Sequence, residues 1–444
     1  MTSHSEKATL HYPSSASEVP GSRHNQIQKI IFDGTSRLTT AFPRLGARLL
    51  NLTFGSIAAN PILGDLFNYH NRRVVRRLTS FRRFLVIPDI HIGDAVMTQA
   101  AVTALRDFAP EAQVDFVLNR AARPLIEGNP EMTRVLPYFV GGSVPSGAVL
   151  AAWRNLARSQ PYDLCLNFCP YIKDTELTSG GLDVLNIMTQ APLIIANEVH
   201  HVQANHFIYR QYRFIQDLLR LVAKRKRQEP FRGVRLTFQN STVHQARAFA
   251  RSIGLTHDRP VVMLNPDAAS PYSRIPFRNQ ADLLARLARL EALVLIGEGH
   301  TEAGIGNRLR ATLAPRLRSK IRIIPAALPL EVYAALIDTC DVFISGDTGP
   351  LHLAAARRYS LSGRFAFRNR TAVLSIFGAT PARMSGYDSF QPGYLPSNQD
   401  APSWTYVAGS PCRNITCLNK IFKTCRSVRC FEEFDAAHLA GLVA

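Results

Sequence analysis

Acidic residues are scarce in this chain. Its 444 residues contain 33 Asp and Glu against 52 Lys and Arg, which gives a formal net charge of +19. Such an excess of positive charge predicts an anionic partner: nucleic acid, an acidic membrane surface or phosphorylated small molecules. Charge alone does not choose among these three. Because no RNA- or DNA-binding motif is visible, nucleic acid is not the expected partner.

Two kinds of hydrophobic segment are also missing. The sequence has no run of 18 or more uninterrupted apolar residues, and residues 1–20 lack a basic stretch followed by an apolar one. These absences disfavour a secreted or membrane-spanning product. We therefore expect a cytoplasmic protein, either free or peripheral at the inner face of the cytoplasmic membrane.

Length and composition indicate a folded protein of two domains with appendages. Hydrophobic residues make up 46% of the chain and charged residues 19%, the balance of a globular protein. A chain of this length exceeds one ordinary core. The predicted divisions are an N-terminal extension over 1–80, an acceptor domain over 81–230, a linker over 231–258, a donor-binding domain over 259–390, and a cysteine-rich segment with a closing helix over 391–444.

The N-terminal extension has two parts. Residues 1–26 are rich in Ser, His and Pro without periodicity, which is typical of a disordered leader. Residues 27–66 mix Arg with Leu and Phe, and more arginines follow between 72 and 83. A basic amphipathic stretch of this kind can bind acidic lipid headgroups. Helices packed on a domain show the same pattern, so both interpretations stay open.

Strand and helix signals alternate in both halves of the chain. An apolar run over 84–88 is followed by a segment of helical period over 95–108 and a strand over 114–118, and a second alternation begins at 260–265. The pattern predicts an α/β protein with two Rossmann-like parallel sheets. Ligands bind beyond the carboxyl ends of such strands. We therefore expect the chemistry in a central cleft between the two domains.

The segment Gly346-Asp347-Thr348-Gly349-Pro350-Leu351-His352 joins a predicted strand to a helix predicted over 350–358. A helix N-terminus that begins with proline offers free N–H groups and a positive dipole end, which suit a phosphate. The Thr348 hydroxyl can add a donor, and Gly349 permits close approach of the backbone. Asp347 or Thr348 could instead do no more than cap the helix.

Two further loops would face the same cleft. Asp94, after the first predicted strand, could accept the proton of an attacking hydroxyl, or could cap the helix that follows. His91 lies in the same loop, although a single loop histidine is more often a surface residue. In the second domain, Ser273 and Arg274 follow the first strand, and the Arg274 guanidinium could neutralise a leaving phosphate.

Four of the seven cysteines gather near the C-terminus, at Cys412, Cys417, Cys425 and Cys430. Four thiolates are enough for a tetrahedral iron or zinc site, whose role would be structural. Their spacing departs from the usual C-x2-C knuckles. A chance cluster of cysteines is therefore the alternative.

Three segments together resemble glycosyltransferase family 9, the bacterial heptosyltransferases of lipopolysaccharide synthesis. They are Ile92 to Thr98 with its Gly93-Asp94 pair, Glu127 to Pro130, and Gly346 to Ala356, and the resemblance spans residues 84–443. It implies a GT-B fold and an inverting sugar transfer that requires no cofactor at the reacting centre. Asp94 then matches the family's proposed base, His91 and Gly93 belong to the acceptor-side loop, and Asp347 to His352 match the binder of the diphosphate sugar.

The same resemblance implies the substrates. The donor would be a nucleotide-diphospho-sugar, with ADP-heptose expected, and the acceptor a lipopolysaccharide core or another anionic glycan. Ser273-Arg274-Ile275-Pro276 stands where the family has a Lys-Arg-Trp-Pro-like segment, and Glu302 matches an acidic ribose contact. The chain departs from the family in lacking that lysine and tryptophan and in an insertion over 357–370.

These departures leave two alternatives for the function. The cysteine-rich tail is similar to that of the autotransporter heptosyltransferases, which carry a four-cysteine iron site and glycosylate protein. A catalytically silent, basic binding protein of the GT-B type is the other alternative.

Overall fold

The structure is a computed structural model, and part of the chain is described in it. The described residues are 82–88, 91–118, 122–137, 155, 159, 162–168, 193–195, 206–208, 211–212, 215, 234–255, 258–360, 371–380, 382–387, 403–408 and 429–444.

The first half of the described chain forms a parallel sheet of five strands in the order β3-β2-β1-β4-β5. The strand β1 lies at its centre and pairs with β2 on one side and β4 on the other. The order of the strands reverses between β1 and β4, and such a reversal opens a crevice at the carboxyl ends of the strands. The elements are β1 (Arg83–Ile87), α4 (Ile92–Phe108), β2 (Gln113–Leu118), α5 (Arg123–Ile126), β3 (Arg134–Pro137), β4 (Leu164–Asn167) and β5 (Leu193–Ile195).

The second half forms a parallel sheet of six strands in the order β13-β12-β10-β7-β8-β9. In chain order this is the doubly wound arrangement of dinucleotide-binding domains, with its reversal between β7 and β10. Loops that follow β7 and β10 therefore flank a ligand crevice. The strands are β7 (Val261–Asn265), β8 (Leu293–Gly297), β9 (Ile321–Ile324), β10 (Val342–Gly346), β12 (Ala372–Phe377) and β13 (Ser403–Val407).

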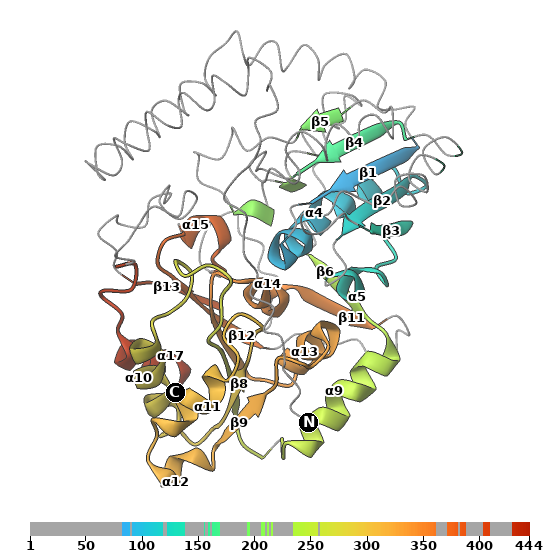
Figure 1. Cartoon of the computed structure of the whole chain (residues 1–444). Coiled ribbons are helices and arrows are strands. Elements are labelled where there is room, and N and C mark those ends of the chain that lie inside the picture. The colour runs from blue at the N-terminus through green and yellow to red at the C-terminus, as the bar shows by residue number, and fades with distance from the viewer. Residues whose placement is uncertain are drawn as a thin grey trace, which may run out of the picture.

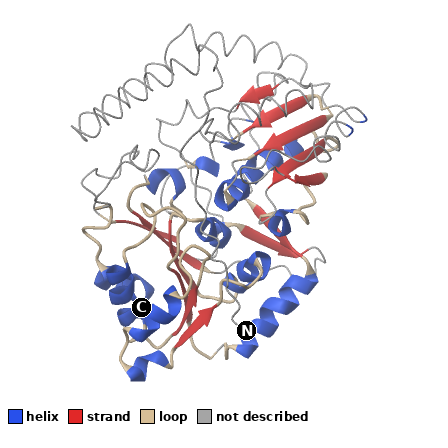
Figure 2. Ribbon diagram, viewed as in Figure 1, coloured by secondary structure: helices blue, strands red, loops and turns tan. Residues whose placement is uncertain are grey.

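Helices cover both faces of this second sheet (Figures 1 and 2). Successive side chains of β7 point to opposite faces, so Val262 and Leu264 join the core beneath α10 and α17, whereas Val261 and Met263 join the core beneath α13. Burial on both faces explains why the strand is continuously apolar. The helices are α9 (Asn240–Ser252), α10 (Phe277–Leu287), α11 (Ile305–Ala311), α12 (Pro315–Arg318), α13 (Leu330–Ile337), α14 (Gly349–Ala355), α15 (Ala382–Ser385) and α17 (Ala436–Val443).

One hydrophobic core connects the two halves. It contains Ala101 and Leu105 of α4 together with Leu351 and Leu353 of α14, all almost fully buried. Figure 1 shows α4 and α14 side by side between the two sheets. The parallel-sheet α/β architecture with two Rossmann-like halves, predicted from the sequence, is confirmed.

The helix predicted over 350–358 is shorter than expected. The helix α14 ends at Ala355, and Ala356 is extended, with φ −71° and ψ 144°. Residues Arg357–Ser360 form β11, which pairs in parallel with β6 (Arg235–Phe238). The prediction of helix at 357 and 358 was wrong because β6, distant in sequence, offers backbone partners that no local pattern reveals.

Two further segments differ from the predicted divisions. The predicted linker over 231–258 contains β6 and α9, and α9 packs against α13. The strand β13 adds to the second sheet from beyond the predicted boundary at 390. The extension over 1–80 and most of the insertion over 357–370 lie outside the described residues. Among the described helices, none has both the length and the apolar character needed to cross a membrane.

Candidate functional site

The two motifs found in the sequence meet where α4 and α14 begin. A Cβ atom added to Gly93 would overlap the His352 ring and lie 3.2 Å from its Nε2 atom. A Cβ atom on Gly349 would lie 3.2 Å from the Cβ atom of Ile92. Glycine at both positions therefore allows the two helix N-termini to come into direct contact. Because each N-terminus carries a partial positive charge, their meeting point suits an anion.

Asp94 lies in the first turn of α4 and is partly exposed. The residue at the N-cap is His91, which is exposed, has φ −81° and ψ 148°, and makes no side-chain capping bond. Asp94 is therefore not the N-cap residue of α4, and an acid in the first turn is favoured by the helix dipole. The helix places Asp94 beside the contact with α14, where a base for the acceptor would be needed. Its role as a base stays a prediction.

Thr348 occupies the N-cap position of α14 but makes no side-chain capping bond. Its hydroxyl lies 2.9 Å from the Ser345 hydroxyl and accepts a hydrogen bond of 3.3 Å from Asn265 Nδ2. Asn265 in turn accepts a hydrogen bond of 3.3 Å from the Tyr333 hydroxyl. This network fixes the start of α14 to the ends of β7 and β10, on either side of the crevice.

Asp347 and His352 form a second network beside the first. Thr380 donates a hydrogen bond of 2.6 Å to Asp347 Oδ2, and His352 Nε2 lies 3.9 Å from Asp347 Oδ1. On its other side, His352 Nδ1 is 2.9 Å from the Tyr387 hydroxyl. Burial lowers the pKa of His352 to about 4, although Asp347 acts in the opposite direction. The imidazole is therefore neutral at pH 7.

His206 is a member of this network that sequence reasoning missed. Its ring lies 4.8 Å, centre to centre, from that of Tyr387. Burial and, as a smaller effect, the proximity of His352 lower the pKa of His206 to about 3. His206 stands in no motif, and only the folded chain brings it to the site. No signal in the sequence could have found it.

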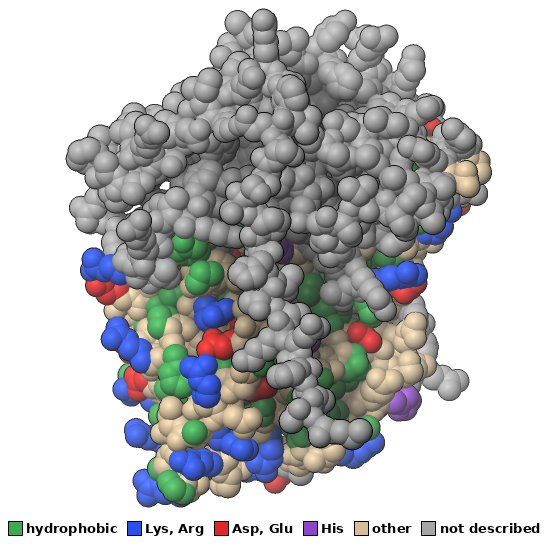
Figure 3. Space-filling view, viewed as in Figure 1, with side chains coloured by type: hydrophobic (Ala, Val, Ile, Leu, Met, Phe, Trp, Pro, Cys, Tyr) green, Lys and Arg blue, Asp and Glu red, His purple; other side chains and the backbone are tan. Residues whose placement is uncertain are grey.

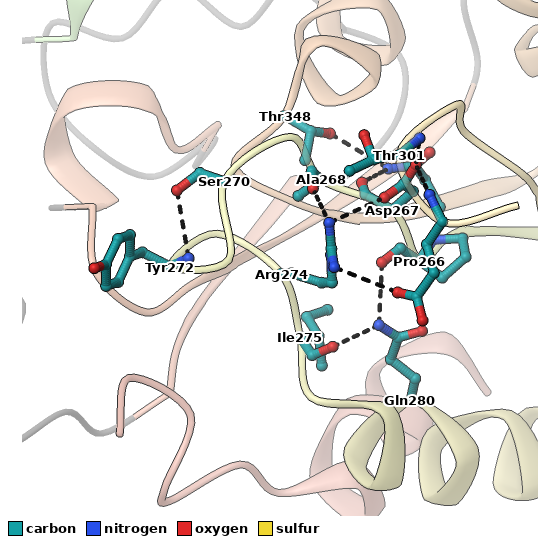
Figure 4. Close-up of polar contacts among 12 residues, drawn as sticks. Pro266, Asp267, Ala268, Ser270, Tyr272, Arg274, Ile275, Gln280, Thr301 and Thr348 are labelled. Atoms are coloured by element: carbon teal, nitrogen blue, oxygen red, sulfur yellow. Dashed lines mark hydrogen bonds and ion pairs between the residues drawn. The ribbon is translucent and has the colours of Figure 1, made fainter. Parts of the chain in front are cut away.

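Arg274 lies at the carboxyl edge of the second sheet among oxygen atoms (Figure 4). Its Nη2 donates a hydrogen bond of 2.7 Å to the Ala268 carbonyl oxygen and lies 3.7 Å from Asp267 Oδ1. Its Nη1 lies 3.5 Å from Glu302 Oε2. The structure thus brings Arg274 and Glu302 together, and their role in donor binding stays a prediction. Asp267, which joins them, was not singled out from the sequence.

Other residues predicted from the sequence pack or form hydrogen bonds within the protein. The Ser273 side chain is buried, and its carbonyl oxygen would lie 2.6 Å from a Cβ atom on Gly346. The Leu351 side chain belongs to the core. Asn129, from the Glu127 to Pro130 segment, donates a buried hydrogen bond of 2.8 Å to Gln99 on α4. These contacts position the helices and strands around the site.

The predicted cysteine cluster lies mostly outside the described residues. Cys430 is described and buried. It packs closely against Gly378, because a Cβ atom added to Gly378 would lie 2.8 Å from the Cβ atom of Cys430. Cys412, Cys417 and Cys425 fall in undescribed segments. Within the described ranges, no three His, Cys, Asp or Glu residues are grouped to hold a metal ion. The iron or zinc site therefore stays a prediction.

Comparison with known proteins relates this geometry to one family. The model of glycosyltransferase family 9 (heptosyltransferase) matches residues 187–363. Lipopolysaccharide heptosyltransferase 2 of Salmonella typhimurium is 21% identical over 285 residues, which cover 62% of this chain and 80% of the relative. Lipooligosaccharide heptosyltransferase 2 of Haemophilus ducreyi is 22% identical over 284 residues, again covering 62% and 80%.

Solved structures show the same fold. A family 9 glycosyl transferase from Veillonella parvula superposes with a TM-score of 0.59 at 17% identity, covering 82% of this chain and 98% of the other. Escherichia coli ADP-heptose lps heptosyltransferase II superposes with a TM-score of 0.53 at 17% identity, covering 79% and 99%. With its paired parallel sheets of the GT-B type and its match to the family model over residues 187–363, the chain is similar to the heptosyltransferase-like glycosyltransferases of family 9.

Proposed function

We propose that the protein transfers a sugar from a nucleotide-diphospho-sugar to a hydroxyl group of an anionic glycan, with inversion at the anomeric carbon. The direct contact between the α4 and α14 N-termini supports this proposal, because it brings the first turn of α4, which contains Asp94, against the Asp347 to His352 segment. The acceptor oxygen attacks the anomeric carbon from the face opposite the diphosphate. The bond to the diphosphate oxygen breaks with its electron pair, and Asp94 accepts the acceptor's proton.

The second half of the chain would bind the donor. The loop that carries Arg274 follows β7 and the N-terminus of α14 follows β10, so both stand where the order of the strands reverses. A guanidinium and a helix N-terminus both stabilise the negative charge that develops on a departing diphosphate. Glu302, beside Arg274, is then placed for the hydroxyl groups of the nucleoside ribose. We take ADP-heptose as the donor, since one structural neighbour is an ADP-heptose lps heptosyltransferase II.

The first half would bind the acceptor. The relatives named for lipopolysaccharide and lipooligosaccharide favour a lipopolysaccharide core, whose phosphates would be attracted by a net charge of +19. Lys and Arg side chains are spread over the surface of the second half in Figure 3. The same charge favours a peripheral position on an acidic membrane. A protein acceptor is the alternative, and it depends on the cysteine-rich tail.

The assignment of Asp94 is tested by Asp94→Asn. Loss of a general base should lower kcat by about 10²- to 10⁴-fold, because the amide cannot accept the proton. Binding of ADP, measured by calorimetry, should be almost unchanged because the nucleotide would lie in the other half. Glu111→Gln, at an exposed carboxylate just beyond the end of α4, is the control and should keep full activity. Wild-type turnover by Asp94→Asn would refute the assignment.

Nucleotide binding and product formation distinguish an enzyme from a catalytically silent binding protein. A ligand that binds only the folded chain raises its melting temperature. ADP, UDP and GDP, and then their sugars, should therefore be compared by thermal unfolding and by mass analysis of the products. Stabilisation by one nucleotide with formation of a glycosylated product supports the enzyme. Absence of both with every nucleotide would favour the silent alternative.

A further inference from the structure

Four charged side chains form a continuous chain at the edge of the second sheet. Asp267 Oδ1 lies 3.7 Å from Arg274 Nη2, and Arg274 Nη1 lies 3.5 Å from Glu302 Oε2. Glu302 Oε1 then lies 2.7 Å from Arg308 Nη1 on α11. The two carboxylates balance the two guanidinium groups. The predicted phosphate ligand, Arg274, is thus already neutralised by neighbouring carboxylates.

Asp267 is the most enclosed of the four, with a side chain 5% exposed. Its Oδ2 atom accepts hydrogen bonds from the backbone N–H groups of Thr301 (2.9 Å) and Glu302 (3.3 Å). A Cβ atom on Gly299 would lie 2.9 Å from the Cβ of Asp267, so that loop approaches closely. One oxygen of Asp267 therefore fastens the loop after β8 to the loop after β7 (Figure 4).

The other oxygen of Asp267 is left to face Arg274. Asp267 Oδ1 is buried and makes no hydrogen bond, and the Nε atom of Arg274 is likewise buried without a hydrogen-bond partner. The two charged groups are therefore close together, but no hydrogen bond joins Asp267 Oδ1 to Arg274. An ionised carboxylate or phosphate can accept two parallel hydrogen bonds from a guanidinium, which is stronger than a contact of 3.7 Å.

We propose that Asp267 is a positioning residue that serves as the resident counterion of Arg274 and is exchanged for the donor's diphosphate. This inference rests on the proposed function of the site. When the diphosphate arrives, Arg274 completes its hydrogen bonds with phosphate oxygens, and the Asp267 charge beside them opposes the incoming anion. Asp267 therefore weakens the binding of the nucleoside diphosphate and speeds its release after transfer.

The counterion role makes a prediction that a merely structural role does not. Asp267→Asn keeps an oxygen for the Thr301 and Glu302 N–H groups but removes the negative charge next to Arg274. ADP should then bind about three- to tenfold more tightly, since a nearby opposing charge has been removed at a site of intermediate dielectric. Turnover should fall because the product leaves more slowly. A residue that only braced two loops would lose affinity and stability together.

The experiment uses the full chain and calorimetry with two probes, ADP and inorganic pyrophosphate, for the wild type and Asp267→Asn. Asp282→Asn is the matched control, because Asp282 forms an exposed ion pair with Arg286 on α10. Tighter binding of both probes to Asp267→Asn, with an unchanged control and a lower kcat, supports the proposal. Unchanged or weaker binding to Asp267→Asn overturns it.

Failure of this proposal is distinguishable from failure of the proposed function. If Asp267→Asn binds both probes more tightly but no sugar is transferred from any donor, the counterion role stands and the enzyme assignment falls. If transfer occurs and Asp267→Asn binds ADP like the wild type, only the counterion role falls. If the wild type binds neither ADP nor pyrophosphate, both are overturned.

Discussion

At the scale of single residues, replacement of Gly93 tests whether the close contact between α4 and the second half of the chain is needed for activity. In Gly93→Ala the new methyl group would overlap the His352 ring, so α4 must shift away from α14. Displacement of a catalytic group by about 1 Å can lower a rate by about 10²-fold. We expect that loss in kcat with ADP affinity almost intact. Gly441→Ala, where an added Cβ meets nothing within 4 Å, should match the wild type. Full activity in Gly93→Ala would show that close contact of the two helices is not required.

Individual residues differ in how far the sequence could predict them. Asp347 and Thr348 directly follow β10, and Arg274 stands in the loop that follows β7, where the topology of a parallel sheet places ligand-binding loops. Asp267 stands in the same loop as Arg274, but its importance depends on the backbone of a loop 34 residues further on. His206 and Tyr387 come from segments without any motif. Their partnership with His352 is a tertiary contact that local spacing cannot encode.

At the scale of elements, the closing helix α17 depends on its packing against α10. The Leu439 side chain is fully buried in the core that also contains Leu283 and Leu287 of α10. Leu439→Ala should lower the free energy of unfolding by about 2–5 kcal/mol, through lost burial and the cavity left behind. Denaturation with urea measures this loss. Leu442→Ala, at a partly buried position of the same helix, should cost less. Equal losses at the two positions would contradict this packing.

The elements themselves were predictable where they are apolar and regular. Residues 261–265 read as a buried strand because both of its faces are covered. The end of α14 and the pairing of β11 with β6 were not predictable, since 122 positions separate the paired residues Arg357 and Arg235. A short strand gains its stability from its partner rather than from its own propensity. Pairing across such a distance has no local signature.

At the scale of the whole molecule, two buried histidines link the folding of the chain to pH. His206 and His352 lie where the segment 206–208, the helix α14 and the residues after α15 meet. Burial lowers the pKa of His352 to about 4 and that of His206 to about 3. An unfolded chain would restore both pKa values to about 6.5. Between these limits the unfolded chain binds more protons than the folded one.

The free energy of unfolding should therefore have its full value above pH 6.5 and decrease as the pH falls toward 4. Each histidine contributes a decrease of up to about 1.4 kcal/mol in the free energy of unfolding per pH unit in that window. Urea denaturation at pH 7, 6 and 5 measures the slope for the wild type and for His206→Gln, which lacks one titrating group. The variant should show a shallower slope, whatever its stability at pH 7. His438→Gln, at an exposed position of α17, is the control for replacing a histidine by glutamine. Equal slopes for wild type and His206→Gln would mean that His206 is protonated as readily in the folded chain as in the unfolded one, and that the junction between the two halves does not exclude the charge.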